Sequence, residues 1–332
     1  MADVRRGVRE LLESAEASTG ALVLVALSGG QDSLALAAAT AFEAPRAGLR
    51  AGAVVVDHGL QPGSGAVAER AAEQAVALGL DPVLVVPVAV GDDGGPEAAA
   101  RTARYAALES AASETGATLV LLGHTLDDQA ETVLLGLARG SGASSLHGMA
   151  VLSDPVAGVR YGRPLLGVRR SVTSQSCADA GLEPWADPQN SDPAFARVRV
   201  RETVLPMLER ELGPGIAEAL ARTADQLRED GAALDHFAEE LAEDIADLAE
   251  SGISLSVRAL ASNPAALRQR LIRLAVASEF HVSLSRAQTL EVARLVTHWH
   301  GQKALDLPGI TVERRGGFLV FTKPARAHPV SP

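Results

Sequence analysis

The sequence predicts an open, doubly wound α/β sheet, mostly parallel, followed by a smaller, mainly helical domain that ends in a β-hairpin. Three observations lead to this prediction. Short apolar runs alternate with helical patterns in the first part of the chain, helical spacing dominates after residue 216, and two strand-like runs joined by a glycine pair lie near residue 316. Strands that alternate with helices form parallel sheets whose faces the helices cover. The chain of 332 residues is long enough for two or three domains.

Four short runs, apolar throughout and rich in β-branched residues, have the composition of strands buried on both faces. They span Ala21–Leu27, Ala51–Asp57, Pro82–Val88 and Ala117–Gly123. Helical apolar spacing fills the intervals, over Ser33–Phe42, Gly65–Gly79 and Glu97–Thr115. Sheets of this kind bind ligands beyond the carboxyl ends of their strands, which is where the polar motifs of this chain fall.

The second part of the chain is predicted to be less regular at first and then helical. Val159–Leu166 is expected to be a further strand or extended segment, and Trp185–Pro193 a loop. Helical spacing follows over three segments, the first forming one long or two shorter amphipathic helices: Ile216–Leu248, Pro264–Phe280 and Ser285–Val296. The terminal hairpin pairs Ile310–Arg315 with Phe318–Thr322. We divide the chain into a sheet domain (1–212), a helical domain with its hairpin (213–322) and a disordered tail (323–332).

Composition narrows the classes of function. The single cysteine, Cys177, excludes an internal disulfide framework and a multi-cysteine zinc site, and its helical context predicts a packing role. No apolar run is long enough to cross a membrane, and the first residues mix charges with helical apolar spacing, unlike a signal peptide. We therefore expect a cytoplasmic protein with no membrane partner.

The net charge of −11 argues against a nucleic-acid partner when it is taken alone, because phosphate neutralisation needs local Lys and Arg. Acidic residues concentrate between Glu209 and Glu250, however, and arginines cluster at two places, namely 160–170 and 197–201. A basic face on an acidic protein is therefore compatible with the sequence.

The segment Ser28-Gly29-Gly30-Gln31-Asp32-Ser33 lies between a predicted strand and a predicted helix. Its glycines permit unusual dihedrals, and successive backbone N–H groups at a helix N-terminus form an anion-binding nest. A carboxylate beside phosphates is repulsive, so Asp32 indicates that a divalent cation such as Mg²⁺ lies between them. The alternative is a tight turn in which Asp32 or Ser33 caps the helix. The full pattern favours phosphate binding.

Two further groups are less specific. Asp57 and His58 follow the second strand, and they either line a nucleotide pocket or form a polar strand end before a turn. Arg101, Arg104 and Tyr105 share one face of the third helix, where spacing alone favours a solvated surface.

The densest polar cluster follows the fourth strand: His124, Asp127, Asp128 and Glu131, with a helix predicted to begin near Asp127. Interaction with the helix dipole explains one carboxylate. Asp128 and Glu131 share a face, where like charges cost stability, so we expect a cation among them. The spacing matches no zinc signature, and an amine or Mg²⁺ is expected instead.

Together these motifs resemble a known family. SGGQDS (28–33) resembles the PP-loop of the N-type ATP pyrophosphatases. The ordered pattern of the tRNA(Ile)-lysidine synthetase family is similar to VDHGLQPGS (56–64), AAARTARY (98–105), GHTLDDQAETVLLGLARGSG (123–142), GRPLLGVRR (162–170), WADPQNSD (185–192) and ARVRVRETVLP (196–206). The likeness covers about the first two thirds of the chain, and GHxxDDxxET with RGSG and RPLL is its most specific part.

That family adenylates the C2 carbonyl oxygen of the wobble cytidine of tRNA(Ile), and the ε-amine of free lysine then displaces AMP to give lysidine. The resemblance thus implies a PP-loop ATPase-like fold and a ligase that acts on ATP, free L-lysine and tRNA(Ile) with a CAU anticodon, with Mg²⁺ as cofactor. It also implies a tRNA-contacting role for 213–322. A homodimer is left open.

For the nucleotide, the resemblance implies that Ser28–Ser33, Asp57 and His58 bind ATP. Asp32 would help to hold Mg²⁺ and pyrophosphate. Arg104, rather than Arg101, would steady the triphosphate and its developing charge.

For the acceptors, the resemblance implies that Asp128 and Glu131 contact the lysine amine or the reacting cytidine, with His124 and Asp127 beside them. The residues implied to meet tRNA or nucleotide are Arg197, Arg199 and Arg201.

The chain departs from the family in two respects. Arg197-Val198 stands where the family has Arg-Asn, and the extra C-terminal domain of longer members does not follow the hairpin. The alternatives are another PP-loop tRNA-modifying or amidating synthetase, or a nucleotide-binding module without catalysis. A thiolase would need paired cysteines, no glutaminase signature is visible, and the presence of Asp32 and Asp128 disfavours an inactive module.

Overall fold

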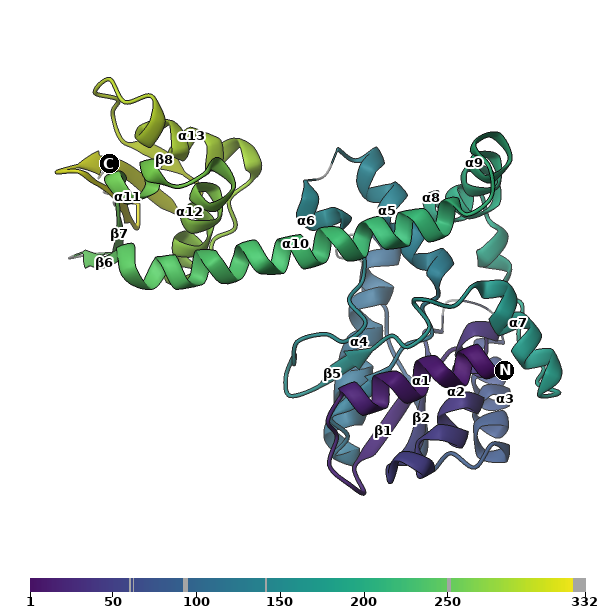
Figure 1. The fold of residues 1–332 in the computed structure, drawn as a ribbon. Helices are drawn as coiled ribbons and strands as arrows, with labels where there is room; N and C mark the ends of the chain where they lie inside the picture. The colour runs from purple at the N-terminus through teal and green to yellow at the C-terminus, as the bar shows by residue number, and fades with distance from the viewer. Residues whose placement is uncertain (60, 62, 92–94, 141, 250–251, 325–332) are drawn as a thin grey trace, which may run out of the picture. The chain divides into compact units, whose positions relative to one another are not determined.

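The computed structural model describes residues 1–59, 61, 63–91, 95–140, 142–249 and 252–324 (Figure 1). The chain divides into two compact units: unit 1 comprises Met1–Ser141 and Ser145–Asp225, and unit 2 comprises Gly142–Ser144 and Gln226–Pro332. The boundary drawn from the sequence after residue 212 stays a prediction. Most of the predicted tail, 325–332, lies outside the described residues.

A five-stranded parallel sheet forms the centre of unit 1, in the order β3-β2-β1-β4-β5. Its strands are β1 (Leu22–Leu27), β2 (Arg50–Asp57), β3 (Val83–Pro87), β4 (Leu119–Leu121) and β5 (Arg160–Gly162). The chain winds outward from β1 in both directions, so the doubly wound sheet predicted from the sequence is confirmed.

Helices cover both faces of this sheet, which is why β1 is buried along its whole length and is apolar throughout. Alternate residues of β1 enter two different cores, with Val23, Val25 and Leu27 in one, and Leu22, Leu24 and Ala26 in the other. The first core also contains α1 (Ala2–Ser14), α2 (Gln31–Glu43), α3 (Ser64–Ala77) and α7 (Arg170–Asp179). The second core contains α4 (Pro96–Thr115).

One segment of unit 1 differs from the sequence expectation. β5 ends at Gly162 rather than continuing to Leu166, because Pro164 has no N–H to donate to a ladder and begins a turn. The arginines at 197, 199 and 201 lie on a helical segment made of α8 (Ala196–Arg199), a π-helical turn (Val200–Val204) and α9 (Leu205–Leu212). The other short elements are α5 (Leu126–Ala138), α6 (Ala143–Leu146) and single 3₁₀ turns at Pro45–Ala47 and Pro188–Ser191.

The acidic amphipathic segment forms one long helix, α10 (Ile216–Ile245), so the single-helix alternative holds. Gly213 and Gly215, both with positive φ, separate it from α9. The helical pattern predicted to Leu248 is wrong at its end, because β6 (Ala246–Ala249) follows directly.

An antiparallel sheet in the order β6-β7-β10-β9-β8 is the centre of unit 2. The predicted hairpin is confirmed as β9 (Ile310–Arg315) and β10 (Phe318–Thr322), and it is joined by β7 (Gly252–Ser256) and β8 (Leu305–Leu307). Besides the C-terminal part of α10, the unit contains α11 (Val257–Ser262), α12 (Ala265–Phe280) and α13 (Arg286–Thr297). Gly252 lies against Phe321 in β10, where a side chain would clash with the carbonyl oxygen.

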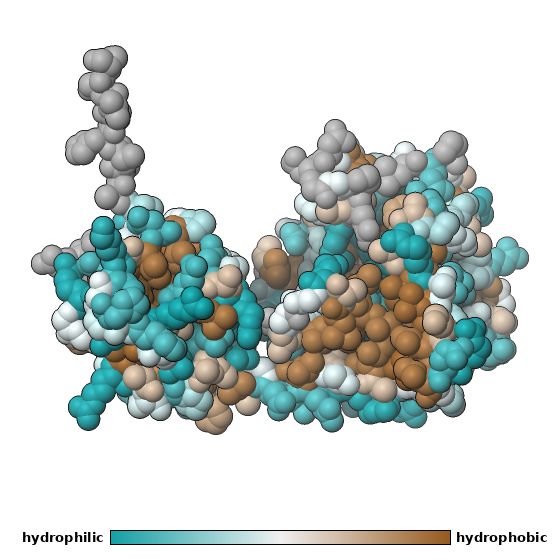
Figure 2. Space-filling view, turned by 90° about the horizontal axis from the view of Figure 1, so that it is seen from above, coloured by the Kyte–Doolittle hydropathy of each residue, from teal (hydrophilic) through white to brown (hydrophobic). Residues whose placement is uncertain are grey.

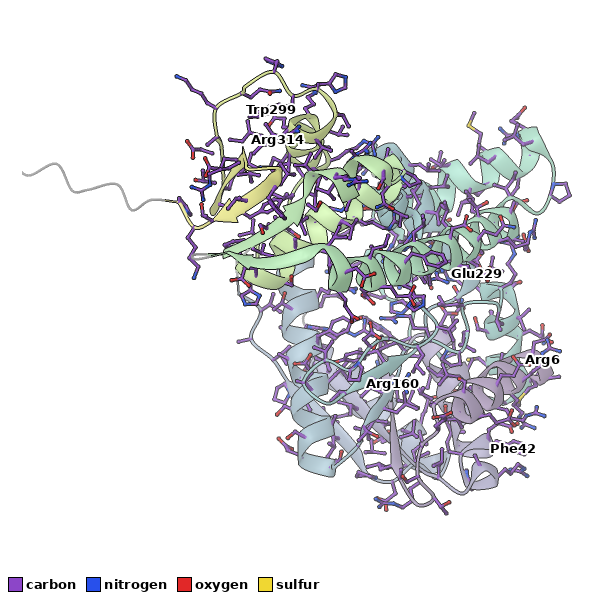
Figure 3. All side chains as sticks on the ribbon, turned by 60° about the vertical axis from the view of Figure 1, so that its left-hand side comes forward. Arg6, Phe42, Arg160, Glu229, Trp299 and Arg314 are labelled. Atoms are coloured by element: carbon purple, nitrogen blue, oxygen red, sulfur yellow. The ribbon has the colours of Figure 1, made fainter. Side chains whose placement is uncertain are left out.

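Two surface features stand out among the described residues, a hydrophobic area on unit 1 and a stacked arginine–tryptophan pair on unit 2. Hydrophobic residues gather on one face of unit 1 (Figure 2). In unit 2 the exposed ring of Trp299 lies under the guanidinium of Arg314, whose central carbon is 5.1 Å from the ring centre (Figure 3). No helix among the described residues is both long and apolar enough to cross a membrane.

Candidate active site

The loop between β1 and α2 is a tight turn stabilised by its own serines. Gly29 has a φ of +80°, which favours glycine. The Ser33 hydroxyl lies 3.1 Å from the Ser28 hydroxyl, accepts from the Ser28 N–H at 3.2 Å and donates to the Gly30 carbonyl at 2.9 Å. Gly30 is the N-cap of α2 and makes no side-chain capping bond. The capping alternative is therefore not observed, and the helix N-terminus is arranged like an anion site.

Asp32, in the first turn of α2, is bound to residues of α7. Its Oδ2 atom accepts from Nε of Arg170 at 3.3 Å, and its Oδ1 atom accepts from the Thr173 hydroxyl. Burial raises the pKa of Asp32 by more than these two partners lower it. The charge of this carboxylate therefore depends on a cation close by, a role that Arg170 fills here.

A cavity of about 170 Å³ opens at the carboxyl ends of β1 and β2. Its walls combine valines of β2 with Asp57, His58, Arg104 and Trp185. Asp57 accepts from the Gly59 N–H at 3.0 Å, and this bond lowers its pKa. The cavity has the mixed apolar and polar lining of a small-molecule site.

Arg104 differs from its neighbour Arg101, although both were expected on one solvated face. Arg101 is exposed and stacks on Tyr105, whereas Arg104 is half-buried and lines the cavity, so the surface interpretation is wrong for Arg104. Burial lowers the pKa of Arg104, and the guanidinium of Arg101 lowers it further. Burial and Arg104 also lower the pKa of His58. An anion in the cavity would compensate this positive charge.

The carboxylates that follow β4 are placed by the start of α5. Asp128 and Thr125 form a capping box, in which Asp128 Oδ2 accepts from the Thr125 N–H at 2.8 Å and from its hydroxyl at 2.9 Å. The helix-terminus alternative thus accounts for one oxygen of Asp128. Its other oxygen, and the fully buried carboxylate of Glu131, face arginines.

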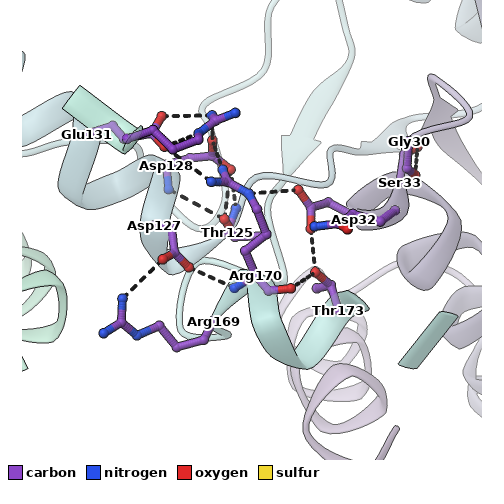
Figure 4. Close-up of polar contacts among 12 residues, drawn as sticks. Gly30, Asp32, Ser33, Thr125, Asp127, Asp128, Glu131, Arg169, Arg170 and Thr173 are labelled. Atoms are coloured by element: carbon purple, nitrogen blue, oxygen red, sulfur yellow. Dashed lines mark hydrogen bonds and ion pairs between the residues drawn. The ribbon is translucent and has the colours of Figure 1, made fainter. Parts of the chain in front are cut away.

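Three arginines surround this pair, and Figure 4 labels one of them, Arg170. Arg170 lies 2.7 Å from Asp128 Oδ1 and 3.3 Å from Glu131 Oε1. Arg201 binds Glu131 through two bonds of 2.7 and 3.0 Å, and Arg197 approaches Glu131 to 3.5 Å. Burial raises the pKa of Asp128, but Arg170 and Thr125 lower it to a greater extent. The chain's own arginines therefore compensate these carboxylates, and the amine or Mg²⁺ expected from the sequence stays a prediction.

Two other predicted site residues point elsewhere. Asp127 accepts from Arg169 Nη1 at 3.1 Å and from the Arg170 N–H at 2.7 Å, so it fixes the start of α7. Arg199 is exposed and donates to the carbonyls of Pro193 and Ala194. The structure brings Arg197 and Arg201 to the carboxylates and leaves Arg199 on the surface. Val198, in place of the asparagine usual in the family, is buried.

His124 lies close enough to Asp128 and to Arg104 for both charges to affect its pKa. Burial lowers its pKa to about 3, with Asp128 acting in the opposite direction and Arg104 adding to the decrease. Its buried Nδ1 atom has no hydrogen-bond partner among the described residues. His124 is thus a neutral ring near pH 7, with a nitrogen free for a ligand.

Sequence reasoning missed three contributors. It placed Arg170 in a basic cluster without a role, although the position just after the fifth strand was a usable signal. Thr173 and Trp185 carry no local signal, yet Thr173 binds Asp32 and the Trp185 N–H donates to the Gly29 carbonyl at 2.9 Å. Cys177 behaves as predicted: it is buried, and burial raises its pKa to about 11.

No group of three or more His, Cys, Asp or Glu side chains is arranged to hold a metal ion within the described part of the chain. Mg²⁺ needs fewer protein ligands, because it keeps several waters and takes phosphate oxygens. One carboxylate beside a phosphate loop, as in Asp32, fits that requirement.

Comparison with known proteins agrees with these features. Family models match residues 2–208 as "PP-loop domain" and residues 255–320 as "TilS substrate binding domain". A tRNA(Ile)-lysidine synthase of Leifsonia xyli subsp. xyli is 64% identical over 91% of this chain and 90% of that protein. The tRNA(Ile)-lysidine synthase of Thermobifida fusca is 53% identical over 94% of this chain and 93% of that protein.

A solved structure supports the fold alone. The U34-tRNA thiolase of Methanococcus maripaludis aligns with a TM-score of 0.58 and 19% identity, over 69% of this chain and 79% of that one.

Proposed function

The chain belongs to the tRNA(Ile)-lysidine synthase family, and from that premise we propose how its residues divide the reaction. The enzyme is an ATP-dependent ligase. The C2 carbonyl oxygen of the wobble cytidine attacks the α-phosphorus of ATP and releases pyrophosphate. The ε-amine of free lysine then attacks C2 and displaces AMP, giving lysidine. The observation that carries the assignment is Arg170, which joins the phosphate loop to a buried carboxylate pair.

The nucleotide half is assigned to the phosphate loop and its cavity. The nest at 28–33 receives the phosphates, and the cavity lined by Asp57 and His58 receives the nucleoside. Arg104 is a half-buried cation near two other arginines, Arg101 and Arg163, so an anionic triphosphate is its fitting partner.

Asp32 is the residue that would hold Mg²⁺, because it is the carboxylate inside the phosphate nest. When bound, the ion would neutralise charge on the phosphate oxygens. Thr173 orients Asp32 by donating to its second oxygen.

The acceptor half is assigned to Asp128 and Glu131. Both carboxylates are buried and face cations, so a lysine ammonium would meet them in a medium where charge pairing is strong. Because its pKa is lowered, Asp128 binds an ammonium as a carboxylate and does not retain its proton. His124, with its free Nδ1, would receive a hydrogen bond from a substrate group or give one to it.

The tRNA half rests on Arg199 and on unit 2. Arg199 is exposed and its partners are neutral carbonyls, so its charge is free for phosphate. A homodimer and a cytoplasmic location stay predictions.

The test is nucleoside analysis of tRNA(Ile) after incubation with the chain, ATP, Mg²⁺ and lysine. We expect lysidine only when all components are present. A tRNA with uridine at the wobble position is the control and should stay unmodified. Absence of lysidine with a folded enzyme and the complete mixture would refute the proposal.

A further inference from the structure

Arg170 is shared by the two halves of the proposed reaction. Its Nε, Nη1 and Nη2 atoms donate to Asp32 at 3.3 Å, to Glu131 at 3.3 Å and to Asp128 at 2.7 Å. Arg201 reaches Asp128 and Glu131 but not Asp32. Of the described residues, Arg170 is the one that hydrogen-bonds both to the phosphate loop and to the carboxylate pair.

Two hydrogen bonds hold the backbone of Arg170, whereas its side chain is free to change rotamer. Its N–H donates to Asp127 at 2.7 Å, and its carbonyl accepts from the Thr173 hydroxyl at 2.8 Å. A change at this residue is therefore a change of the side chain alone. A guanidinium fork binds phosphate as well as it binds carboxylate, so a triphosphate offers Arg170 a second set of acceptors.

Building on the proposed function, we propose that Arg170 is a positioning residue that couples ATP binding to lysine binding. In the absence of substrates its guanidinium stands where two substrate cations would lie: the metal ion at Asp32 and the lysine ammonium at Asp128 and Glu131. When ATP binds with its cation, the Arg170 side chain leaves Asp32 and binds the phosphates instead. Its departure uncovers Asp128 and Glu131 for the ammonium.

Charge sets the sign of this coupling. With Arg170 in place, an incoming ammonium meets a carboxylate pair that already lies beside three guanidinium groups, and like charges at short range repel. With Arg170 on the phosphates, only Arg201 and the more distant Arg197 remain beside the pair. Lysine therefore binds more tightly once ATP is bound, and linkage requires that lysine tighten ATP binding by the same factor.

The experiment is calorimetric titration of L-lysine into the full chain without tRNA. It is done once with the chain alone and once with Mg²⁺ and α,β-methylene ATP, which resists cleavage between the α- and β-phosphates. For wild type we expect the nucleotide and Mg²⁺ to lower the Kd of lysine by about 5- to 150-fold, as is usual for coupled sites. In Arg170→Gln the ratio of the two Kd values should approach one.

Arg169→Gln is the matched control, because Arg169 carries the same charge and binds Asp127, Glu209 and Glu218, none of which belongs to the shared set. It should keep the wild-type ratio. If Arg170→Gln fails to fold, Arg170→Lys tests the same point, since an ammonium lacks the planar fork that binds carboxylate and phosphate through paired bonds, and the ratio should again fall toward one.

The titrations distinguish a failure of the coupling from a failure of the proposed function. A wild-type ratio near one, or an unchanged ratio in Arg170→Gln, overturns the coupling while both ligands still bind. Failure of lysine to bind under either condition overturns the proposed function as well.

Discussion

Asp32 is a carboxylate whose charge is opposed by burial and is maintained by its neighbours. A neutral amide of the same shape should therefore fit the position, and Asp32→Asn should fold. We expect this variant to lose tRNA-dependent ATP–pyrophosphate exchange by at least about 100-fold, because it removes the charge that faces the phosphates. Thr173→Val is the control: it deletes the other bond to Asp32 but keeps the carboxylate, and it should retain most of the exchange. Wild-type exchange in folded Asp32→Asn would falsify the metal role.

His124 gives a pH dependence to stability. Its pKa is about 3 in the folded chain and about 6.5 when exposed, so between these values the unfolded chain binds a proton that the folded chain does not. Stability is therefore full above pH 6.5 and is lost as the pH falls toward 3. Between pH 7.5 and 5.5 the expected loss from this residue is about 1.4 kcal/mol.

In His124→Gln this loss should disappear. The measurement is the urea midpoint of both proteins at the two pH values. The other histidines cancel in the comparison, so an equal acid-side loss in the variant would contradict the burial argument.

At the scale of residues, the sequence located the chemistry but not the pairing. SGGQDS and the acids after β4 were assigned to the site because they combine charge with strand ends. For Arg104, helical spacing alone favoured the surface, since it cannot tell which face of α4 meets a cavity, and the family resemblance was needed to assign it to the triphosphate. The link through Arg170 was not predictable, because its partners are distant in the chain. Asp32 lies 138 positions before it and Asp128 lies 42 positions before it.

Among the elements, the end of β4 is held against the phosphate loop by the absence of a side chain. A Cβ on Gly123 would lie 3.1 Å from backbone atoms of Asp32 and of Ser33. Backbone cannot yield as a flexible side chain would, so Gly123→Ala should displace the loop. We expect a loss of about 1–3 kcal/mol in the free energy of unfolding, together with a higher KM for ATP.

Gly167→Ala is the matched control, because a Cβ there meets nothing within 4 Å. Thermal melting and ATP-dependent steady-state kinetics check both variants. A normal KM for ATP in Gly123→Ala would mean that the loop tolerates movement of β4.

Pattern and length explain which elements were predictable. β1 and β2 are buried on both faces, and the sequence predicted their first and last residues to within one residue. β5 was predicted too long, because the apolar Leu165 and Leu166 pack in a turn rather than in the sheet. β6 was read as the end of α10, since a short apolar run fits either period. β7 and β8 were missed because they are short, five and three residues long, and carry little period-2 signal.

At the scale of the whole molecule, charge is strongly segregated. The chain carries a net charge of −11, yet residues 252–324 contain ten Lys and Arg against four Asp and Glu. Both lysines of the chain lie in this segment. Several of its cations are exposed, including Arg286 and Arg294 of α13. Residues 252–324 therefore supply a basic surface that the total charge hides, which suits an RNA partner.

This segregation predicts a specific salt dependence of tRNA binding. Each phosphate contact adds about 0.7–0.9 to the steepness of log K against log salt. Replacing Arg286 and Arg294 by Ala should therefore flatten the slope by about 1.4–1.8, while the KM for ATP is unchanged. Arg199→Ala should flatten it by about 0.7–0.9, whereas Arg201→Ala should impair lysidine formation at an unchanged slope, because Arg201 is engaged by Glu131.

The measurement is fluorescence anisotropy with labelled tRNA(Ile) from low to physiological salt. Arg222→Ala, an exposed arginine on the acidic helix α10, changes the net charge by the same amount per residue and serves as the control. If Arg222→Ala flattened the slope as much per residue as the α13 variants do, total charge would be the cause and not the basic surface of residues 252–324. An unchanged slope in the α13 double variant would remove α13 from the tRNA interface. Flattening confined to the α13 and Arg199 variants is the result expected when an acidic protein binds RNA through a segregated basic face.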